Sequence, residues 1–179
     1  NTVTAESSHR QQPLYLFADI GGTNARFAFA EPQSRVPVTI ATYAVKEFPA
    51  FEKVIEQLAE DWHELSHSDT YLSRVCMAVA AVPGKREISF TNNPWRFSKA
   101  ELAAQLDCPE IRIVNDFSAI ARSLPALEPE HLEPIGSGAA KSGKPMVVIG
   151  PGTGTGVASV GFNELGKPVV LPGQGGHVD

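Results

Sequence analysis

The sequence predicts an α/β protein with two lobes, and three observations lead to that fold class. Apolar runs of strand length alternate with amphipathic helical segments along residues 14–126. One pattern occurs twice: a strand, a glycine turn that carries threonine, and a second strand, at residues 20–26 and 150–158. A stretch rich in Pro, Gly and Ser, residues 127–144, separates the two copies. Two lobes that each present such a hairpin to one cleft would hold a polyphosphate from both sides.

The first lobe opens with three consecutive expected strands, at residues 14–18, 25–30 and 38–45. An amphipathic helix follows at residues 51–65, where apolar side chains recur at helical spacing and charged side chains face the other way. Residues 74–82 form a nearly continuous apolar run, which suits a strand covered on both faces.

Shorter elements complete this lobe. Ser98 and Glu101 form a capping box, with a hydroxyl followed three residues later by a carboxylate, and this pattern starts a helix that Pro109 ends. Further strands are expected at residues 87–90 and 111–114, and a further helix at residues 117–124.

The second lobe begins with expected strands at residues 146–149, 157–160 and 169–171. The glycine run between the first two, residues 150–156, lacks the GxGxxG spacing and precedes a strand rather than a helix, which argues against a dinucleotide-binding fold. Taken alone, this run is equally compatible with a phosphate loop and with an ordinary glycine-rich turn.

Composition restricts the function classes. With 42% hydrophobic residues the chain can bury a substantial core, and its net charge of -5 argues against nucleic acid as a partner. No run of about 20 apolar residues suggests a membrane span. The polar start of the chain, residues 1–13, is expected to be a flexible leader without a signal peptide. Cys76 and Cys108 lack metal-ligand spacing, and Cys76 is expected to be a buried free thiol, which fits the cytoplasm.

The first glycine turn is a candidate phosphate-binding hairpin. Its apolar strand ends in a carboxylate, and glycines without a Cβ let backbone N–H groups approach an anion closely. An ordinary tight turn is the alternative, which two glycines alone would favour. The candidate binding residues are Asp19, Gly21, Gly22, Thr23 and Asn24.

Asn115 and Asp116 form the best candidate for catalysis. A carboxylate between the end of a strand and the start of a helix is well fixed and partly desolvated, which suits a general base that removes a proton from a hydroxyl. Both residue types also serve as helix caps, and that alternative is favoured when the pair is considered alone. His177, after two glycines, is either a ligand contact or an ordinary surface residue.

Together these residues resemble the bacterial glucokinase family, within the actin, Hsp70 and sugar-kinase superfamily. The matching segments are ADIGGTNARFAFA, TNNPWRFS, IVNDF, GPGTGTGVA and LPGQGGHVD, which occur in family order. The resemblance implies a ribonuclease H-like (actin-like ATPase) fold and the Mg²⁺-assisted transfer of phosphate from ATP to the 6-hydroxyl of glucose in the cytoplasm. It also implies a homodimer.

The resemblance assigns roles residue by residue. Asp116 would be the catalytic base, and Asp19 would lie near the Mg²⁺–phosphate assembly as an indirect ligand. Gly21, Gly22 and Thr23 would form a first phosphate loop. Gly152, Thr153 and Gly154 would form the second loop, and the sugar would be bound by Asn92, Asn115, Asp116, Gln174 and His177.

Two departures from the family pattern matter. The family has glutamate where this chain has Gln174, so we expect weakened or altered sugar affinity. Family members also continue past the GGHVD segment. We therefore expect a small lobe at residues 14–126, a connection at 127–145, and only the beginning of a large lobe at 146–179. As an isolated polypeptide, this chain should be inactive and should expose apolar surface.

Two other functions compete with a hexose kinase. A sugar-sensing regulator with the same fold would normally carry an added DNA-binding domain, and no basic helix–turn–helix precedes residue 14. An actin-like or Hsp70-like ATPase is the other alternative. The Asn115–Asp116 pair and the GQGGH turn favour a sugar cleft over it.

Overall fold

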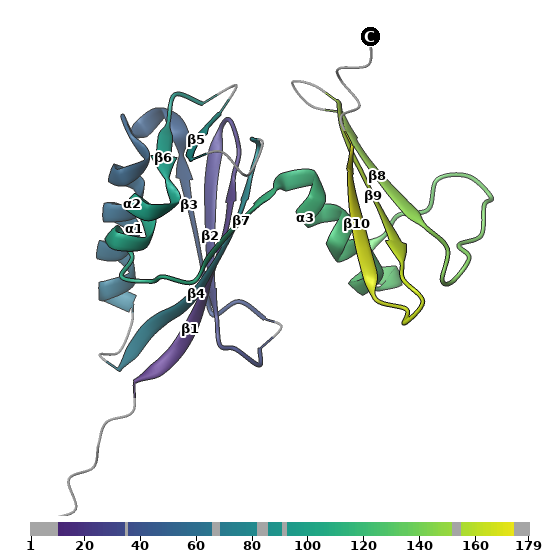
Figure 1. Cartoon of the computed structure of the whole chain (residues 1–179), viewed down its shortest axis with the longest axis horizontal. Coiled ribbons are helices and arrows are strands. Elements are labelled where there is room, and N and C mark those ends of the chain that lie inside the picture. The colour runs from purple at the N-terminus through teal and green to yellow at the C-terminus, as the bar shows by residue number, and fades with distance from the viewer. Residues whose placement is uncertain are drawn as a thin grey trace, which may run out of the picture. The chain divides into compact units, whose positions relative to one another are not determined.

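The computed structural model of the chain describes residues 11–34, 36–65, 69–81, 86–90, 93–151 and 155–173. The chain divides into two compact units, residues 1–113 and residues 114–179. Figure 1 shows the elements of both units, and each unit is treated by itself below.

A five-stranded sheet with the order β3-β2-β1-β4-β7 forms the first unit (Figure 1). β1 pairs antiparallel with β2, β2 pairs antiparallel with β3, and β1 pairs parallel with β4. The expected strands are confirmed within a few residues, although β4 starts and ends earlier than the apolar run at 74–82. The bounds are β1 (Gln12–Ile20), β2 (Asn24–Ala30), β3 (Thr39–Ala44), β4 (Thr70–Val79) and β7 (Ile111–Asn115).

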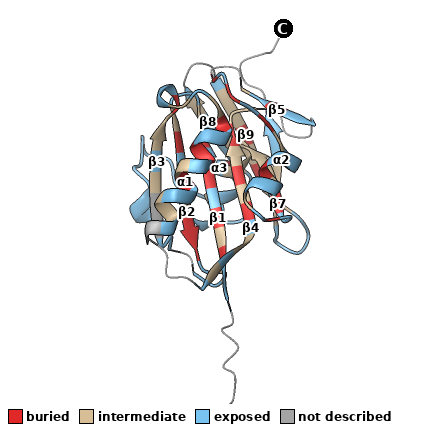
Figure 2. Ribbon diagram, turned by 90° about the vertical axis from the view of Figure 1, so that its left-hand side faces the viewer, coloured by how far each residue is buried: buried red, intermediate tan, exposed pale blue. Residues whose placement is uncertain are grey.

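The core of the first unit lies between this sheet and its helices. β1 alternates strictly, so that Leu16 and Ile20 are fully buried while Phe17 is exposed. The expected amphipathic helix is α1 (Phe51–Leu65), and its apolar positions, such as Val54 and Ile55, join the same core. Figure 2 shows buried stretches, in red, along β1 and β4. Each fully buried aliphatic or aromatic side chain contributes roughly 1.5–3 kcal/mol.

One expectation about β4 is wrong. Val75, Met77 and Val79 are buried, but Cys76 between them is only half-buried, and Tyr71 is exposed. β4 therefore covers the core with one face only in the part of the chain described here. On the second face of the described strand the apolar run continues with the small side chains of Cys76 and Ala78, which are only half-buried.

A small antiparallel pair completes the first unit: β5 (Glu87–Ser89) and β6 (Arg96–Ser98). The capping box at the start of α2 (Lys99–Gln105) is confirmed. The Glu101 N–H donates to Ser98 Oγ at 3.1 Å, and the Ser98 N–H donates to Glu101 Oε2 at 2.8 Å. A one-turn 3₁₀ helix, η1 (Val45–Glu47), follows β3.

The second unit is a three-stranded antiparallel sheet with the order β10-β9-β8 and one helix, α3 (Asp116–Ser123), that packs on it (Figure 1). Its strands are β8 (Met146–Pro151), β9 (Thr155–Phe162) and β10 (Pro168–Gly173). The expected first lobe ran to residue 126, whereas the division seen here falls before α3, because α3 packs on β8, β9 and β10. Two 3₁₀ helices, η2 (Leu124–Ala126) and η3 (Pro129–His131), follow α3.

Within the residues described, no helix has the length and apolar character needed to cross a membrane.

Candidate functional site

The first glycine turn joins β1 to β2 and is fixed at both ends. The Gly21 N–H donates to the Asn24 carbonyl at 2.9 Å, and the Val45 N–H donates to the Thr23 carbonyl at 2.9 Å. Gly22 and Thr23 are exposed at the tip. No described residue accepts a hydrogen bond from the N–H group of Gly22 or Thr23. The turn thus presents backbone donors on a rigid base, which is the arrangement that binds anions.

Asp19 lies opposite Arg26 on the neighbouring strand, and the two side chains form an ion pair with Nη1–Oδ2 at 3.2 Å. Both side chains are about half exposed, so the pair contributes only about 0.2–1 kcal/mol. Among the described residues no group of three or more His, Cys, Asp or Glu side chains could hold a metal ion. A single carboxylate beside a phosphate loop still fits Mg²⁺, which commonly binds through one or two carboxylates, water and substrate phosphates.

Asn93 connects the first turn to the segment that follows β5. Its side chain is buried, its Nδ2 donates to the Gly21 carbonyl at 3.1 Å, and its Oδ1 accepts from the Trp95 N–H at 2.9 Å. The Asn93 side chain therefore provides hydrogen-bond partners for the Gly21 carbonyl and for the backbone N–H of the fully buried Trp95. This bridge ties Asn93 and Trp95, which follow β5 in the chain, to the first glycine turn.

Asn115 is a helix cap, which the sequence predicts as the alternative to a catalytic role. It precedes α3 in an extended conformation, and its Oδ1 accepts from the Ser118 N–H at 3.1 Å. Asp116 is the first helical residue, and its Oδ1 accepts from the Phe117 N–H at 2.8 Å. Both residues are half-buried. The Asp116 carboxylate therefore lies at the N-terminal end of α3 and accepts a backbone hydrogen bond there.

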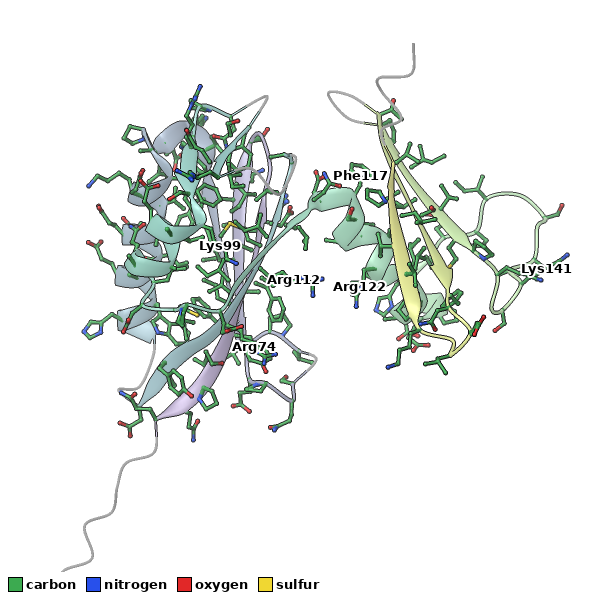
Figure 3. All side chains as sticks on the ribbon, in the orientation of Figure 1. Arg74, Lys99, Arg112, Phe117, Arg122 and Lys141 are labelled. Atoms are coloured by element: carbon green, nitrogen blue, oxygen red, sulfur yellow. The ribbon has the colours of Figure 1, made fainter. Side chains whose placement is uncertain are left out.

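The second glycine turn is framed by strands that the structure describes. Pro151 pairs with Thr155, and Gly150 pairs with Gly156 on the next rung of the β8–β9 ladder. The Phe117 ring lies against both Gly150 and Gly156, so these two glycines provide space for a side chain from α3. Figure 3 labels Phe117 at the start of α3. The base candidate and the strands leading into the second turn therefore belong to one packed unit.

A glucokinase family model matches residues 16–179 of this chain. The chain belongs to the glucokinase family. It is 37% identical over 176 residues to a glucokinase of Colwellia psychrerythraea and 38% identical over 164 residues to one of Photorhabdus laumondii. These matches cover 97% and 92% of this chain but only 51% and 49% of the relatives, so the chain spans about half the length of the curated relatives it matches.

Solved glucokinases have the same fold. The structure superimposes on a glucokinase from an Antarctic psychrotroph with a TM-score of 0.75 at 29% identity, over 92% of this chain and 51% of the other. A Balamuthia mandrillaris glucokinase crystallised with glucose gives a TM-score of 0.69 at 21% identity, over 98% of this chain and 51% of that one. The hexokinase of Schistosoma mansoni gives 0.55 at 20% identity, over 95% of this chain and 43% of that one. The expected actin-like ATPase fold of sugar kinases is thereby confirmed.

Several residues that the glucokinase resemblance singled out lie outside the described residues. They are Asn92, Gly152, Thr153, Gly154, Gln174 and His177. Their roles remain expectations.

Two residues that shape this candidate site, Asn93 and Phe117, are not among the residues that the sequence predicts for it. Asn93 stands in the recognised TNNPW segment, but nothing in the sequence tells which asparagine turns inward. The sequence predicts Phe117 only as the first residue of the helix at 117–124. Its spacing cannot reveal that the ring meets two glycines more than 30 residues away.

Proposed function

We propose that this chain supplies much of the active site of a glucokinase, which transfers the γ-phosphoryl group of ATP to the 6-hydroxyl of glucose. The observation that carries the proposal is the position of Asp116. It directly follows β7, begins α3, and belongs to the same packed unit as the strands of the second glycine turn. Family membership agrees with this reading.

In the proposed reaction Asp116 accepts the proton of the glucose 6-hydroxyl. At the same time the hydroxyl oxygen bonds to the γ-phosphorus and ADP leaves. The backbone donors of the turn at residues 21–23 hold phosphate oxygens, as residues 152–154 would from the second hairpin. Asn92, Asn115, Gln174 and His177 would orient the sugar. Bound Mg²⁺, with Asp19 nearby, would neutralise charge on the phosphates.

The decisive experiment uses the full-length protein in a coupled assay for glucose 6-phosphate. Asp116→Asn keeps the size of the side chain and removes its basicity, so kcat should fall by about 10²–10⁴-fold with little change in unfolding temperature. Glu164→Gln, an exposed carboxylate in the β9–β10 turn, is the matched control and should keep full activity. An Asp116→Asn enzyme with wild-type kcat would refute the proposal.

The same assay decides specificity and donor. Glucose should be preferred over mannose and fructose, and ATP over inorganic polyphosphate. Thermal shifts separate the competing functions: stabilisation by glucose without turnover indicates a sugar sensor, and stabilisation by nucleotide alone indicates an ATPase of another kind.

Gln174 gives a finer test. Gln174→Glu in the full-length protein should tighten glucose binding, because a carboxylate accepts a stronger hydrogen bond from a sugar hydroxyl than an amide does. Unchanged glucose affinity would contradict the expected contact. The proposal further includes a homodimer and a cytoplasmic location, for which sedimentation of the full-length protein and fractionation of the cells are the measurements.

A further inference from the structure

The contact between Phe117 and the β8–β9 hairpin has an unusual shape. Gly150 and Gly156 are direct cross-strand neighbours, and the Phe117 ring occupies the place that side chains of both residues would fill. A Cβ on Gly156 would overlap three ring atoms, and one on Gly150 would lie 2.7 Å from the ring Cε1. Real Cβ atoms essentially never come so close, so any other residue type at these positions would force the Phe117 ring to move.

These two glycines are needed for space and not for backbone freedom. Neither has a positive φ, whereas Gly136, Gly143 and Gly166 do. Gly161 on the same strand offers a matched comparison, because a Cβ added there would meet nothing within 4 Å and its φ is also not positive.

The backbone of Phe117 is directly coupled to the base candidate. Phe117 follows Asp116 in the chain, and its N–H donates to Asp116 Oδ1 at 2.8 Å. On the opposite side, Gly150 and Gly156 lie one rung before Pro151 and Thr155, from which the second glycine loop extends. A displacement of Phe117 that includes its backbone would therefore move the Asp116 carboxylate relative to Pro151 and Thr155.

We infer that Phe117 is a positioning residue, whose ring, seated over Gly150 and Gly156, fixes the Asp116 carboxylate relative to Pro151 and Thr155 at the end of the β8–β9 ladder. This inference rests on the proposed function. Phosphoryl transfer depends on alignment of base, hydroxyl and phosphorus, and a misplacement of about 1 Å can cost roughly 10²-fold in rate. An ordinary packing contact would instead affect stability alone.

The test uses the full-length protein with Gly156→Ala, Phe117→Leu, the double variant, and Gly161→Ala as control. Gly156→Ala should lower kcat at least tenfold while the glucose Kd changes less than threefold. It should also move the acid limb of the kcat profile to higher pH, because a loosened hydrogen bond from Phe117 N–H stabilises the ionised carboxylate less. Phe117→Leu removes the overlapping ring atoms, so the double variant should regain part of the lost kcat. Gly161→Ala should match the wild type.

Every result of this experiment either supports or overturns the inference about Phe117. Wild-type kcat and an unmoved acid limb in folded Gly156→Ala would overturn the inference, as would equal losses in Gly156→Ala and Gly161→Ala. If Gly156→Ala does not fold, Phe117→Leu decides instead, with a lowered kcat and a moved acid limb expected and wild-type values overturning the inference. A wild-type protein without glucose turnover would remove the proposed function, and this inference with it. That failure would appear before any variant is compared.

Discussion

The two sheets of this chain differ in how much apolar surface they cover. In the first unit, buried residues from β1, β2, β4 and α1 form one continuous core. In the second unit, α3 covers one face of the sheet, where Ala158 and Val160 are buried. The other face presents apolar side chains to solvent: Val147, Ile149, Val169 and Leu171 are 59%, 64%, 44% and 60% exposed. The first glycine hairpin is therefore supported by a continuous core, whereas the second is supported by the single helix α3.

The largest expected effect tests the completeness of the first core. Phe51→Ala removes a fully buried ring that stacks on Phe97, and should lower the free energy of unfolding by about 3–5 kcal/mol. Both tryptophans and all three tyrosines of the chain lie in residues 1–113, so intrinsic fluorescence in urea follows this unit. The matched variant Val160→Ala in the second unit should leave the fluorescence transition in place. If both variants shift it equally, the two units do not differ as described.

The exposed face of the second sheet gives the next largest effect. We expect the isolated 179-residue chain to self-associate through this face, and Ile149→Lys with Leu171→Lys to weaken association by at least tenfold, because each buried apolar side chain contributes roughly 1.5–3 kcal/mol. Analytical ultracentrifugation across concentrations measures it. Glu164→Lys, a charge change in an exposed turn, is the control. Unaltered association in the double variant would remove this face as the contact.

We expect the Asn93 side chain to stabilise the first glycine hairpin. Asn93→Ala leaves the Gly21 carbonyl and the Trp95 N–H without their buried partner, at a cost of about 1–3 kcal/mol in unfolding free energy. Fluorescence-monitored urea unfolding measures the loss. Asn163→Ala, in the exposed turn between β9 and β10, should leave the fluorescence transition unchanged. A stable Asn93→Ala chain would mean that the first turn does not depend on this bridge.

The smallest effect concerns pH and the contact between β3 and α1. Tyr43 Oη donates to Asp61 Oδ2 at 2.6 Å, which lowers the pKa of Asp61, with a further contribution from Gln57; burial and Asp61 raise the pKa of Tyr43. Because the folded pKa of Asp61 is lowered, its stabilisation is complete above the unfolded value near 4 and is lost as pH falls through the lower folded value.

Tyr43→Phe removes this bond, so it should destabilise the chain by about 1 kcal/mol at pH 7 and by clearly less near pH 2. The free energies of unfolding of the wild type and of Tyr43→Phe, measured at pH 7 and at pH 2, give the difference. Lys53→Ala, which removes an exposed ion pair with Glu56 on the same helix, serves as the control and should have little effect at either pH. An equal deficit for Tyr43→Phe at pH 7 and pH 2 would contradict the assigned cause.

The sequence by itself determined the features that depend on neighbours along the chain. The α1 periodicity, the Ser98–Glu101 capping box and the antiparallel strand pairs β1–β2 and β8–β9 are present where expected, because helices, caps and hairpins are formed by residues close together in the chain. The order of the motifs also predicted the family. The place of Asn115 and Asp116 between a strand and a helix is also as expected, whereas the role of Asp116 as base rests on the family resemblance and stays a prediction.

Only the tertiary structure decided which distant partners meet. Asn93 reaches a carbonyl 72 positions away, α3 joins the second sheet, and Phe117 fills the space of two glycines. One-sided burial of β4 was equally hidden, since an apolar run reads the same whether one face or two are covered. These features depend on how surfaces far apart in the chain fit together. Local spacing carries no record of that fit, because many partners could satisfy the same apolar ring or buried amide.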